Sequence, residues 1–310
     1  MEVVLKDGKR LEVNESNSYA DVASMISPSF RKKVLAAKAN GELVDLNREV
    51  LDGAEVEFIL RDDAEAFEIL NHSCAHLLAQ AIKNLYPEAL FWVGPAIKEG
   101  FYYDIDLGSN VLREEDIAKI EKEMKRIVAG GEKIVRKEVS KEEALDLFKS
   151  NPYKIELIEG LEEDAVITIY SQGNFTDLCR GPHDEKVAEL KNFKILKVSG
   201  AYYKGDSKNK MLQRVYGVCF STPEALQAHL TFLEEAKKRD HKKLGKELEL
   251  FMMSEYGPGF PFWMPKGMIL RRNLENFWFD IHTKEGYQFV QTPIMLNKEL
   301  WETSGHWYNY

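Results

Sequence analysis

Short apolar segments separated by tight turns run through the first part of the chain. Two of them flank Asp7-Gly8, a pair suited to a hairpin turn. A helical spacing covers Tyr19 to Ile26, and a second hairpin is predicted around Asn40-Gly41. A final strand is predicted over residues 55–60. This order predicts a ubiquitin-like β-grasp domain over residues 1–61, with either a docking role or a purely structural one.

An apolar stripe with helical spacing follows a charged hinge. It consists of Phe67, Leu70, Cys74, Leu77, Leu78, Ala81 and Leu85. His72 and His76 lie beside this stripe, at a helix edge that can line a cavity. Mixed strand and helix patterns continue beyond it, with a loop predicted at residues 151–154. Together they predict an α+β domain over residues 62–221.

The last part of the chain changes character twice. Ser221-Thr222-Pro223 predicts the start of one long helix that runs to about Lys246, and the linker is assigned to residues 222–248. Residues 249–310 predict the beginning of a further domain, with an aromatic-rich helix and then a strand ended by Pro293. The fold class is therefore α+β and multi-domain.

Two short motifs concentrate the candidate chemistry. In Asn71-His72-Ser73-Cys74-Ala75-His76 the histidines are four residues apart, so a helix presents both on one side. In Asp177-Leu178-Cys179-Arg180-Gly181-Pro182-His183 the Gly-Pro pair excludes a regular helix between Cys179 and His183 and predicts a loop there. The histidine pair alone is common by chance on an amphipathic helix. Together the two motifs predict one pocket with three imidazoles and a thiol.

Composition indicates the cellular compartment of the protein and the kinds of partner it can bind. Three cysteines in 310 residues argue against a disulfide framework and for the cytoplasm. No apolar run approaches the length of a membrane span, and the N-terminus is not that of a signal peptide. The net charge of -9 disfavours general affinity for nucleic acid. A local basic block is the candidate phosphate contact, and it contains Lys237, Lys238, Arg239, Lys242 and Lys243.

Several longer motifs resemble bacterial threonyl-tRNA synthetases, in the order of that family and across the whole chain. They are His72-Ser73-x-Ala75-His76-Leu77-Leu78, Gly100-Phe101-Tyr102-Tyr103-Asp104, Cys179-Arg180-Gly181-Pro182-His183, residues 205–214 and Arg239-Asp240-His241. The resemblance implies a TGS domain at residues 1–61, an editing domain at 62–221 and a linker at 222–248. Residues 249–310 then resemble the start of a class II catalytic domain, including its motif 1.

The resemblance also implies which residues act in editing. His72, His76, Lys154 and His183 are expected to be catalytic. Tyr103, Asp177 and Cys179 are expected to bind substrate. The expected reaction is hydrolysis of serine from mischarged tRNA(Thr), because a pocket that admits threonine cannot exclude the smaller serine. For Lys154 and Tyr103 the residues alone favour a surface lysine and a strand aromatic.

Three alternatives stay open from the residues. His72, His76, Cys179 and His183 form a plausible zinc set, which would make the chain a metallohydrolase. Cys179 next to histidines can also serve as a covalent nucleophile. Finally, the chain can be a tRNA-binding fragment without catalysis.

The resemblance extends to cofactors and partners. No cofactor is expected for editing, whereas ATP and zinc are expected for the full-length family member, with ligands beyond Tyr310. Motifs 2 and 3 and the anticodon-binding domain are expected there too. The expected partners are tRNA(Thr), threonine, serine and ATP, with a homodimer for the full-length protein and no membrane.

Overall fold

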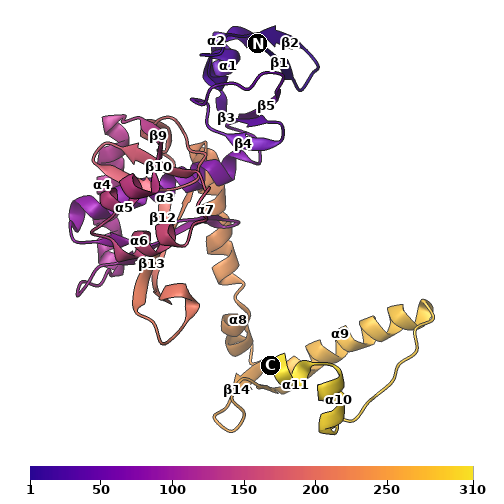
Figure 1. Cartoon of the computed structure of the whole chain (residues 1–310). Helices are drawn as coiled ribbons and strands as arrows, with labels where there is room; N and C mark the ends of the chain where they lie inside the picture. Colours follow the sequence, from indigo (N-terminus) through magenta and orange to yellow (C-terminus); the bar gives the residue numbers. More distant parts are fainter. Residues whose placement is uncertain (310) are drawn as a thin grey trace. The chain divides into compact units, whose positions relative to one another are not determined.

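The computed structural model describes residues 1–309 and contains two compact units, Met1–Leu230 and Thr231–Tyr310, which are described separately (Figure 1). Tyr310, the last residue of the predicted third domain, lies outside the described residues. The α+β, multi-domain class predicted from the sequence is confirmed.

A mixed five-stranded sheet forms the N-terminal part of the first unit. Its order is β2 (Arg10–Glu12), β1 (Glu2–Leu5), β5 (Glu55–Leu60), β3 (Val34–Ala39) and β4 (Glu42–Val44). Only β1 and β5 run parallel. Helices α1 (Tyr19–Ile26) and α2 (Pro28–Arg31) connect β2 to β3. Ser18 and Asp21 form a capping box at the start of α1, which fixes the predicted helix at its N-terminus.

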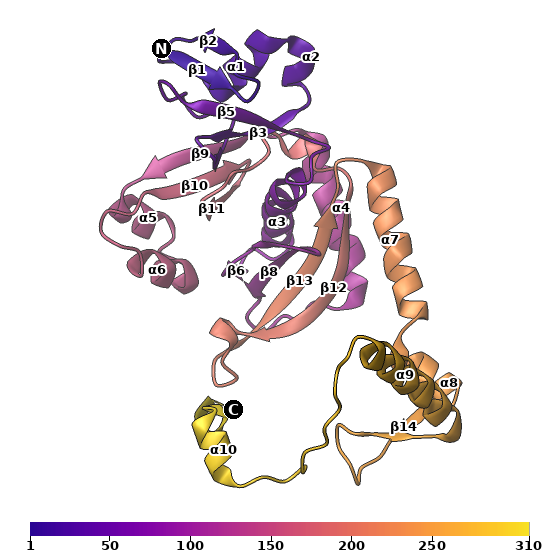
Figure 2. The ribbon, with the colours of Figure 1, turned by 90° about the vertical axis from the view of Figure 1, so that its right-hand side faces the viewer.

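The long helix α3 (Ala66–Leu85) is the centre of the next part of the unit (Figure 2). It packs on a sheet with the order β12 (Phe193–Tyr202), β13 (Met211–Cys219), β8 (Gly100–Asp106) and β6 (Leu90–Phe91). A fifth strand, β7 (Ala96–Ile97), also pairs with β8. Helix α4 (Glu114–Gly130) packs against α3 and ends at Gly131, whose φ of 66° provides a left-handed cap. Apolar side chains of α3 are buried between these layers.

A smaller antiparallel sheet carries the second motif. Its order is β11 (Phe175–Leu178), β10 (Ile167–Gln172) and β9 (Ile134–Val139). Helices α5 (Lys141–Leu147) and α6 (Pro152–Glu159) follow β9, and a capping box of Ser140 and Glu143 begins α5. Two short 3-10 turns, η1 (Val187–Glu189) and η2 (Tyr203–Gly205), complete the part before Pro223.

The loop predicted at residues 151–154 was wrong, whereas the loop predicted between Cys179 and His183 is present. Residues 151–154 begin helix α6 instead of forming a loop, because Asn151 accepts a hydrogen bond from Tyr153 N and Pro152 occupies the first helical turn. Lys154 is therefore mounted on a helix. Asp177 lies on strand β11, and the irregular loop starts only at Cys179.

The predicted single linker helix is divided into α7 (Pro223–Lys238) and α8 (His241–Glu247). Asp240 leaves the helical conformation with ψ at 122°, and its side chain accepts a hydrogen bond from Lys243 N at 2.9 Å. An aspartate in this position caps a new helix, which outweighs the helical pattern on either side.

The second unit contains the hairpin β14 (Phe251–Met253) and β15 (Pro261–Trp263) and helices α9 (Pro265–Lys284), α10 (Lys298–Thr303) and α11 (His306–Asn309). The strand predicted before Pro293 was wrong. No strand within residues 1–309 pairs with this segment, and Val290 remains 88% exposed. A strand pattern without a partner leaves its backbone groups to water.

None of the helices within residues 1–309 has both the length and the apolar character needed to cross a membrane.

The close contact between β8 and β13 provides a stability test. Gly100 has a φ of +140°, and a Cβ there would lie 2.2 Å from the carbonyl oxygen of Gly217. We expect Gly100→Ala to lower the free energy of unfolding by at least ~2 kcal/mol, because both the backbone and the packing oppose a side chain. Thermal unfolding followed by circular dichroism measures this.

Gly108→Ala is the matched control. Its φ is +62°, but a Cβ would meet nothing within 4 Å. We expect a loss of only about 1 kcal/mol from backbone strain. Equal losses for the two variants would contradict the packing argument.

Candidate active site

Helix α3 mounts the two histidines of the first motif on one side, as the four-residue spacing predicts. The ring centroids of His72 and His76 lie 5.6 Å apart. His76 is only 2% exposed, whereas His72 is partly exposed. The ring of His183, from the loop after β11, lies 4.3 Å from each of them. The structure thus brings the three imidazoles together.

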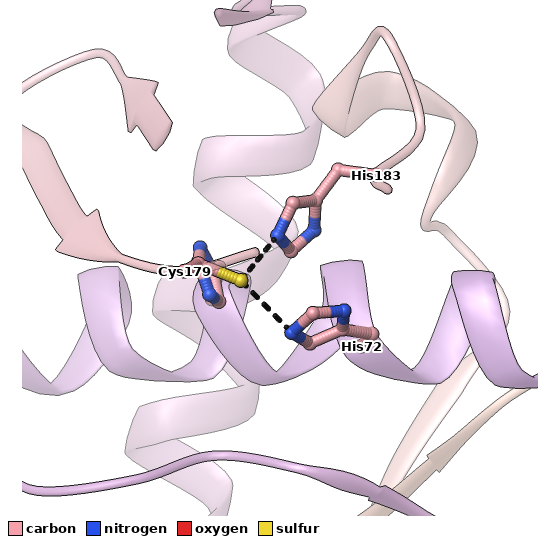
Figure 3. Close-up of side chains that lie close together, drawn as sticks. His72, Cys179 and His183 are labelled. Atoms are coloured by element: carbon pink, nitrogen blue, oxygen red, sulfur yellow. Dashed lines mark hydrogen bonds between the residues drawn. The ribbon is translucent and has the colours of Figure 1, made fainter. Parts of the chain in front are cut away.

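The thiol of Cys179 joins this group from the same loop. Cys179 Sγ lies 3.1 Å from His72 Nε2 and 3.2 Å from His183 Nε2 (Figure 3). The backbone N–H of Gly181 also donates to this sulfur, at 3.4 Å. The helical and looped motifs therefore converge, although 107 residues separate His72 from Cys179.

A second group surrounds the carboxylate of Asp177. Lys154 Nζ lies 2.5 Å from Asp177 Oδ1, and the hydroxyl of Tyr103 donates to Asp177 Oδ2. His76 Nε2 lies 3.6 Å from the same Oδ2 and so connects this group to the three imidazoles. Lys154, Asp177 and Tyr103 are all buried. All seven residues predicted for the editing site thus lie in one cluster.

Burial sets the protonation states of the histidines. It lowers the pKa of His72 to about 4 and that of His76 to about 3, although the Asp177 carboxylate opposes both shifts. Burial also holds the pKa of His183 well below its usual value. All three imidazoles are consequently neutral at pH 7, and each has one nitrogen that accepts a proton.

The acid–base states of the other groups follow from the same surroundings. Burial raises the pKa of the Cys179 thiol to about 12, so a neutral thiol, and not a nucleophilic thiolate, is present at pH 7. Burial favours the neutral form of Asp177, but the Lys154 ammonium outweighs it and lowers the pKa of this carboxyl. Asp177 is therefore charged and Lys154 is its counter-ion.

A surface cavity of about 670 Å³ reaches the cluster at Cys179. Arginine side chains line it from three segments: Arg48 after β4, Arg136 on β9 and Arg180 in the loop. Leu157, Val166 and Leu178 contribute apolar surface. Glu138 also lines the cavity and pairs with Arg136 at 2.7 Å, so Arg48 and Arg180 supply its positive charge, beside apolar surface and Cys179.

Three residues that support the cluster were not predicted as site residues. Ser73 Oγ lies 3.2 Å from His183 Nδ1 and accepts a hydrogen bond from Asp184 N at 2.9 Å. Tyr170 packs its ring against that of His183 and donates its hydroxyl to Asp45. Ser73 belongs to the first motif and could have been found there. Asp45 and Tyr170 carry no signal in the sequence, since long-range folding alone brings them to this loop.

Donor atoms of His72, His76, Cys179 and His183 all lie within 4.8 Å of one another. Ligand atoms of a tetrahedral zinc site are roughly 3.3–3.8 Å apart, close to the separations around Cys179. The Ser73 contact to His183 Nδ1 resembles the outer hydrogen bond that orients a metal-binding histidine. Both the donor atoms of this group and their spacing therefore suit a metal ion.

The five predicted tRNA-binding residues lie in the second unit, outside this cluster. Lys237 and Lys238 end α7, Arg239 follows, and Lys242 and Lys243 begin α8. All five are exposed, and nearby glutamates offset part of their charge, as in the pair of Lys238 Nζ and Glu235 Oε1 at 2.5 Å. The turn at Asp240 separates the basic residues into two groups.

Comparison with known proteins gives this geometry a family context. Residues 1–60 match the model of the TGS domain, and residues 167–216 match that of the threonyl and alanyl tRNA synthetase second additional domain. Over 310 residues the chain is 51% identical to a threonine--tRNA ligase of Clostridium tetani, covering 99% of the chain and 48% of the relative. The chain belongs to the threonyl-tRNA synthetase family.

Other members of this synthetase family give the same result. A threonine--tRNA ligase of Syntrophomonas wolfei is 51% identical over 308 residues, with 99% of the chain and 48% of the relative covered. One of Clostridioides difficile is 50% identical over 312 residues, with 100% and 49% covered. The chain spans about half the length of the curated relatives it matches. The resemblance inferred from the motifs is confirmed, and an unrelated metallohydrolase is not favoured.

The buried pair of Asp177 and Lys154 generates a stability prediction. Removing one partner leaves the other charge buried and unpaired, which typically costs ~3–5 kcal/mol. We therefore expect Asp177→Ala to lower the free energy of unfolding by about 3 kcal/mol. Urea denaturation followed by tryptophan fluorescence and circular dichroism measures the loss.

The double variant Asp177→Ala with Lys154→Met separates pairing from packing. Lys154→Met keeps most of the side-chain length but removes the charge, so adding it should restore about half or more of the lost stability. Strictly additive losses in the two single variants and the double variant would show that the two charges do not depend on each other.

Proposed function

We propose that this chain contains the proofreading part of a threonyl-tRNA synthetase and hydrolyses seryl-tRNA(Thr). The observation that carries the proposal is the convergence of neutral imidazoles, a thiol and a buried lysine–carboxylate pair in one cluster of a family member. The domain boundaries 1–61, 62–221, 222–248 and 249–310 belong to the same proposal. The TGS match over residues 1–60 supports the first of them.

Ester hydrolysis explains why such a cluster is needed. Serine lacks one methyl group of threonine, and a difference of this size gives a synthetic pocket only about 10–200-fold discrimination. A second, smaller pocket can admit serine and hold threonine out. The reaction then needs a placed water, a proton acceptor, a donor for the leaving ribose hydroxyl and a group that binds the α-ammonium.

His76 is the best-placed proton acceptor for the water. The Asp177 carboxylate lies beside Nε2, which favours the tautomer with the proton on that nitrogen. Its Nδ1 has no hydrogen-bond partner within the described residues, although it is buried. A buried acceptor of this kind is available to a water or to substrate. His72 and His183 are placed to exchange the proton with the leaving hydroxyl.

The group around Asp177 is suited to the two charged parts of the substrate. We assign Asp177 to the α-ammonium and Lys154 to the oxygen that gains negative charge in the transition state. Since Lys154 pairs with Asp177 in the structure, the substrate ammonium would replace it there and release it toward the ester. Tyr103 holds the carboxylate through its hydroxyl, and Cys179 forms the wall of the small pocket.

The 670 Å³ cavity beside Cys179 is proposed as the entrance for the tRNA end. Arg48 and Arg180 suit the phosphates of a single strand, whereas Arg136 is paired with Glu138, and the apolar surface suits a nucleobase. The exposed basic residues Lys237, Lys238, Arg239, Lys242 and Lys243 are proposed as further contacts to the tRNA backbone.

A zinc-dependent form of the same hydrolysis is the second candidate, since the four donor atoms fit a metal. His72, His76, Cys179 and His183 would then hold zinc, which when bound supplies a Lewis acid that activates water. Lys154, Asp177 and Tyr103 keep the same roles in either case. We favour hydrolysis without metal, because the neutral imidazoles already supply proton acceptors.

For the full-length protein we propose ATP-dependent charging of tRNA(Thr) with threonine, in the cytoplasm. The threonine--tRNA ligases that the chain matches support this. ATP, zinc and a homodimer are proposed for that protein, with the zinc and ATP ligands beyond Tyr310. Residues 249–310 are proposed as the beginning of its class II catalytic domain.

The central test is deacylation of charged tRNA. Incubated with seryl- and threonyl-tRNA(Thr), the chain should release serine and spare threonine. His76→Ala should slow serine release by about 100-fold or more, within the range expected for loss of a general base. His72→Ala should also slow it. Acid-gel analysis of the remaining charged tRNA measures these rates.

His282→Ala is the control, because His282 lies on α9 in the second unit. It should leave serine release unchanged. Equal hydrolysis of both charged tRNAs would contradict a sieve, and retention of tRNA without any hydrolysis would indicate a binding fragment.

Metal removal separates the two chemical candidates. After dialysis against a chelator, the chain should contain less than stoichiometric zinc by atomic absorption and should still release serine at the untreated rate. Neutral imidazoles can perform the proton transfers alone, so no loss is expected. Stoichiometric zinc whose removal abolishes hydrolysis would establish the zinc-dependent form.

A further inference from the structure

Asp45, in the TGS domain, reaches the loop that carries Cys179 and His183. It follows β4 and is only 8% exposed. Its Oδ1 accepts a hydrogen bond from the backbone N–H of His183 at 3.0 Å. Its Oδ2 accepts one from the Tyr170 hydroxyl at 2.6 Å. One carboxylate therefore binds a proposed catalytic residue and the aromatic side chain next to it.

Tyr170 extends this contact along the loop. Its ring centroid lies 4.5 Å from that of His183, and its hydroxyl is 3.5 Å from the carbonyl oxygen of Arg180. The loop is fitted closely to this hydroxyl, because a Cβ on Gly181 would lie 1.9 Å from it. A change in the position of Tyr170 would consequently move the backbone between Cys179 and His183.

Other contacts attach the two domains without help from Asp45. Arg61 forms two hydrogen bonds with Asp184, at 2.7 and 3.1 Å, and Arg31 pairs with Glu185. Leu35, Ala36 and Ile59 of the TGS sheet belong to the same hydrophobic core as α3. Figure 2 shows this sheet next to β9 and β10. Asp45 is therefore not required to hold the domains together.

We infer that Asp45 is a positioning residue of the hydrolytic site and that the TGS domain is a working part of that site. The carboxylate holds the backbone of His183 through the hydrogen bond from its N–H. It holds the orientation of the His183 ring through Tyr170, which binds the carboxylate and packs against that ring. Cys179 Sγ, 3.2 Å from His183 Nε2, is fixed by the same contact. The expected effect of Asp45 on the rate of serine release rests on the proposed editing function. Its effect on the position of His183 does not.

Two substitutions of Asp45 test the inference kinetically. With the chain in excess over seryl-tRNA(Thr), Asp45→Ala should lower the maximal single-turnover rate by about 10- to 100-fold, as expected for a displacement of the reacting groups near 1 Å. The chain concentration at half-maximal rate should change by less than the rate, because Arg48 and Arg136 of the proposed entrance lie outside the displaced loop. A merely structural role would lower the active fraction and leave the rate constant of the folded molecules unchanged.

Asp45→Asn should restore the rate to within about threefold of the original chain. Its amide oxygen can accept from His183 N, and its amide nitrogen can donate to the Tyr170 hydroxyl. Tyr170→Phe should cause an intermediate loss and should add little when combined with Asp45→Ala, because both changes remove the same contact.

Arg31→Gln is the matched control. It removes a charge pair of the same interface, with Glu185, but neither side chain hydrogen-bonds to Cys179, His183 or Tyr170. It should leave the single-turnover rate within about twofold, as expected when the reacting groups keep their places. An equal loss in Arg31→Gln and Asp45→Ala would overturn the inference, since any loosening of the interface would then suffice.

A nuclear magnetic resonance measurement tests the inference without relying on activity. The ring Cε1–H signal of His183, assigned with a His183→Gln variant, should shift or broaden in Asp45→Ala and stay in place in Asp45→Asn and Arg31→Gln. The signal of His282 serves as an internal reference. An unmoved His183 signal in a folded Asp45→Ala chain would overturn the inference. A native chain that releases no serine would instead overturn the proposed function, and the His183 signal would still decide the role of Asp45.

Discussion

The burial of the inner face of α3 is the constraint on which the site depends. Burial lowers the pKa of all three histidines, so that they stay neutral, and it keeps the Cys179 thiol protonated. The same burial makes the charge of Asp177 tolerable only beside Lys154. Proton acceptors and one compensated ion pair are thus consequences of a single environment. The pKa values of these groups would differ if the helix were exposed to water.

Several elements cooperate to create that environment. Strand β8 supplies Tyr103, α6 supplies Lys154 and β11 supplies Asp177, so the buried ion pair and the tyrosine bound to it come from three different elements. The TGS domain contributes core residues and the carboxylate of Asp45, which accepts a hydrogen bond from the backbone of His183. The TGS domain has a core of its own, but Leu35, Ala36 and Ile59 join it to the core around α3, and the site lies where this second core meets the loop after β11.

The sequence could predict the parts of the site that depend on local geometry. A four-residue spacing on an amphipathic helix places His72 and His76 together whatever surrounds them. The Gly-Pro pair keeps Cys179 and His183 in a loop. Local patterns were insufficient where capping decided the outcome, as at Asn151, which begins the helix that carries Lys154, and at Asp240, which divides the linker helix. Asp45 could not be found at all, because 138 residues separate it from His183.

Helix α3 imposes one further demand on related chains. Each residue added to an α-helix turns everything after it by about 100°. A single insertion between His72 and His76 would leave the first imidazole in the cavity and rotate the second into the apolar layer around Leu77 and Leu78. The length of this segment should therefore tolerate less change than the identity of most of its side chains, and natural variants are expected to show substitutions here but no insertions or deletions.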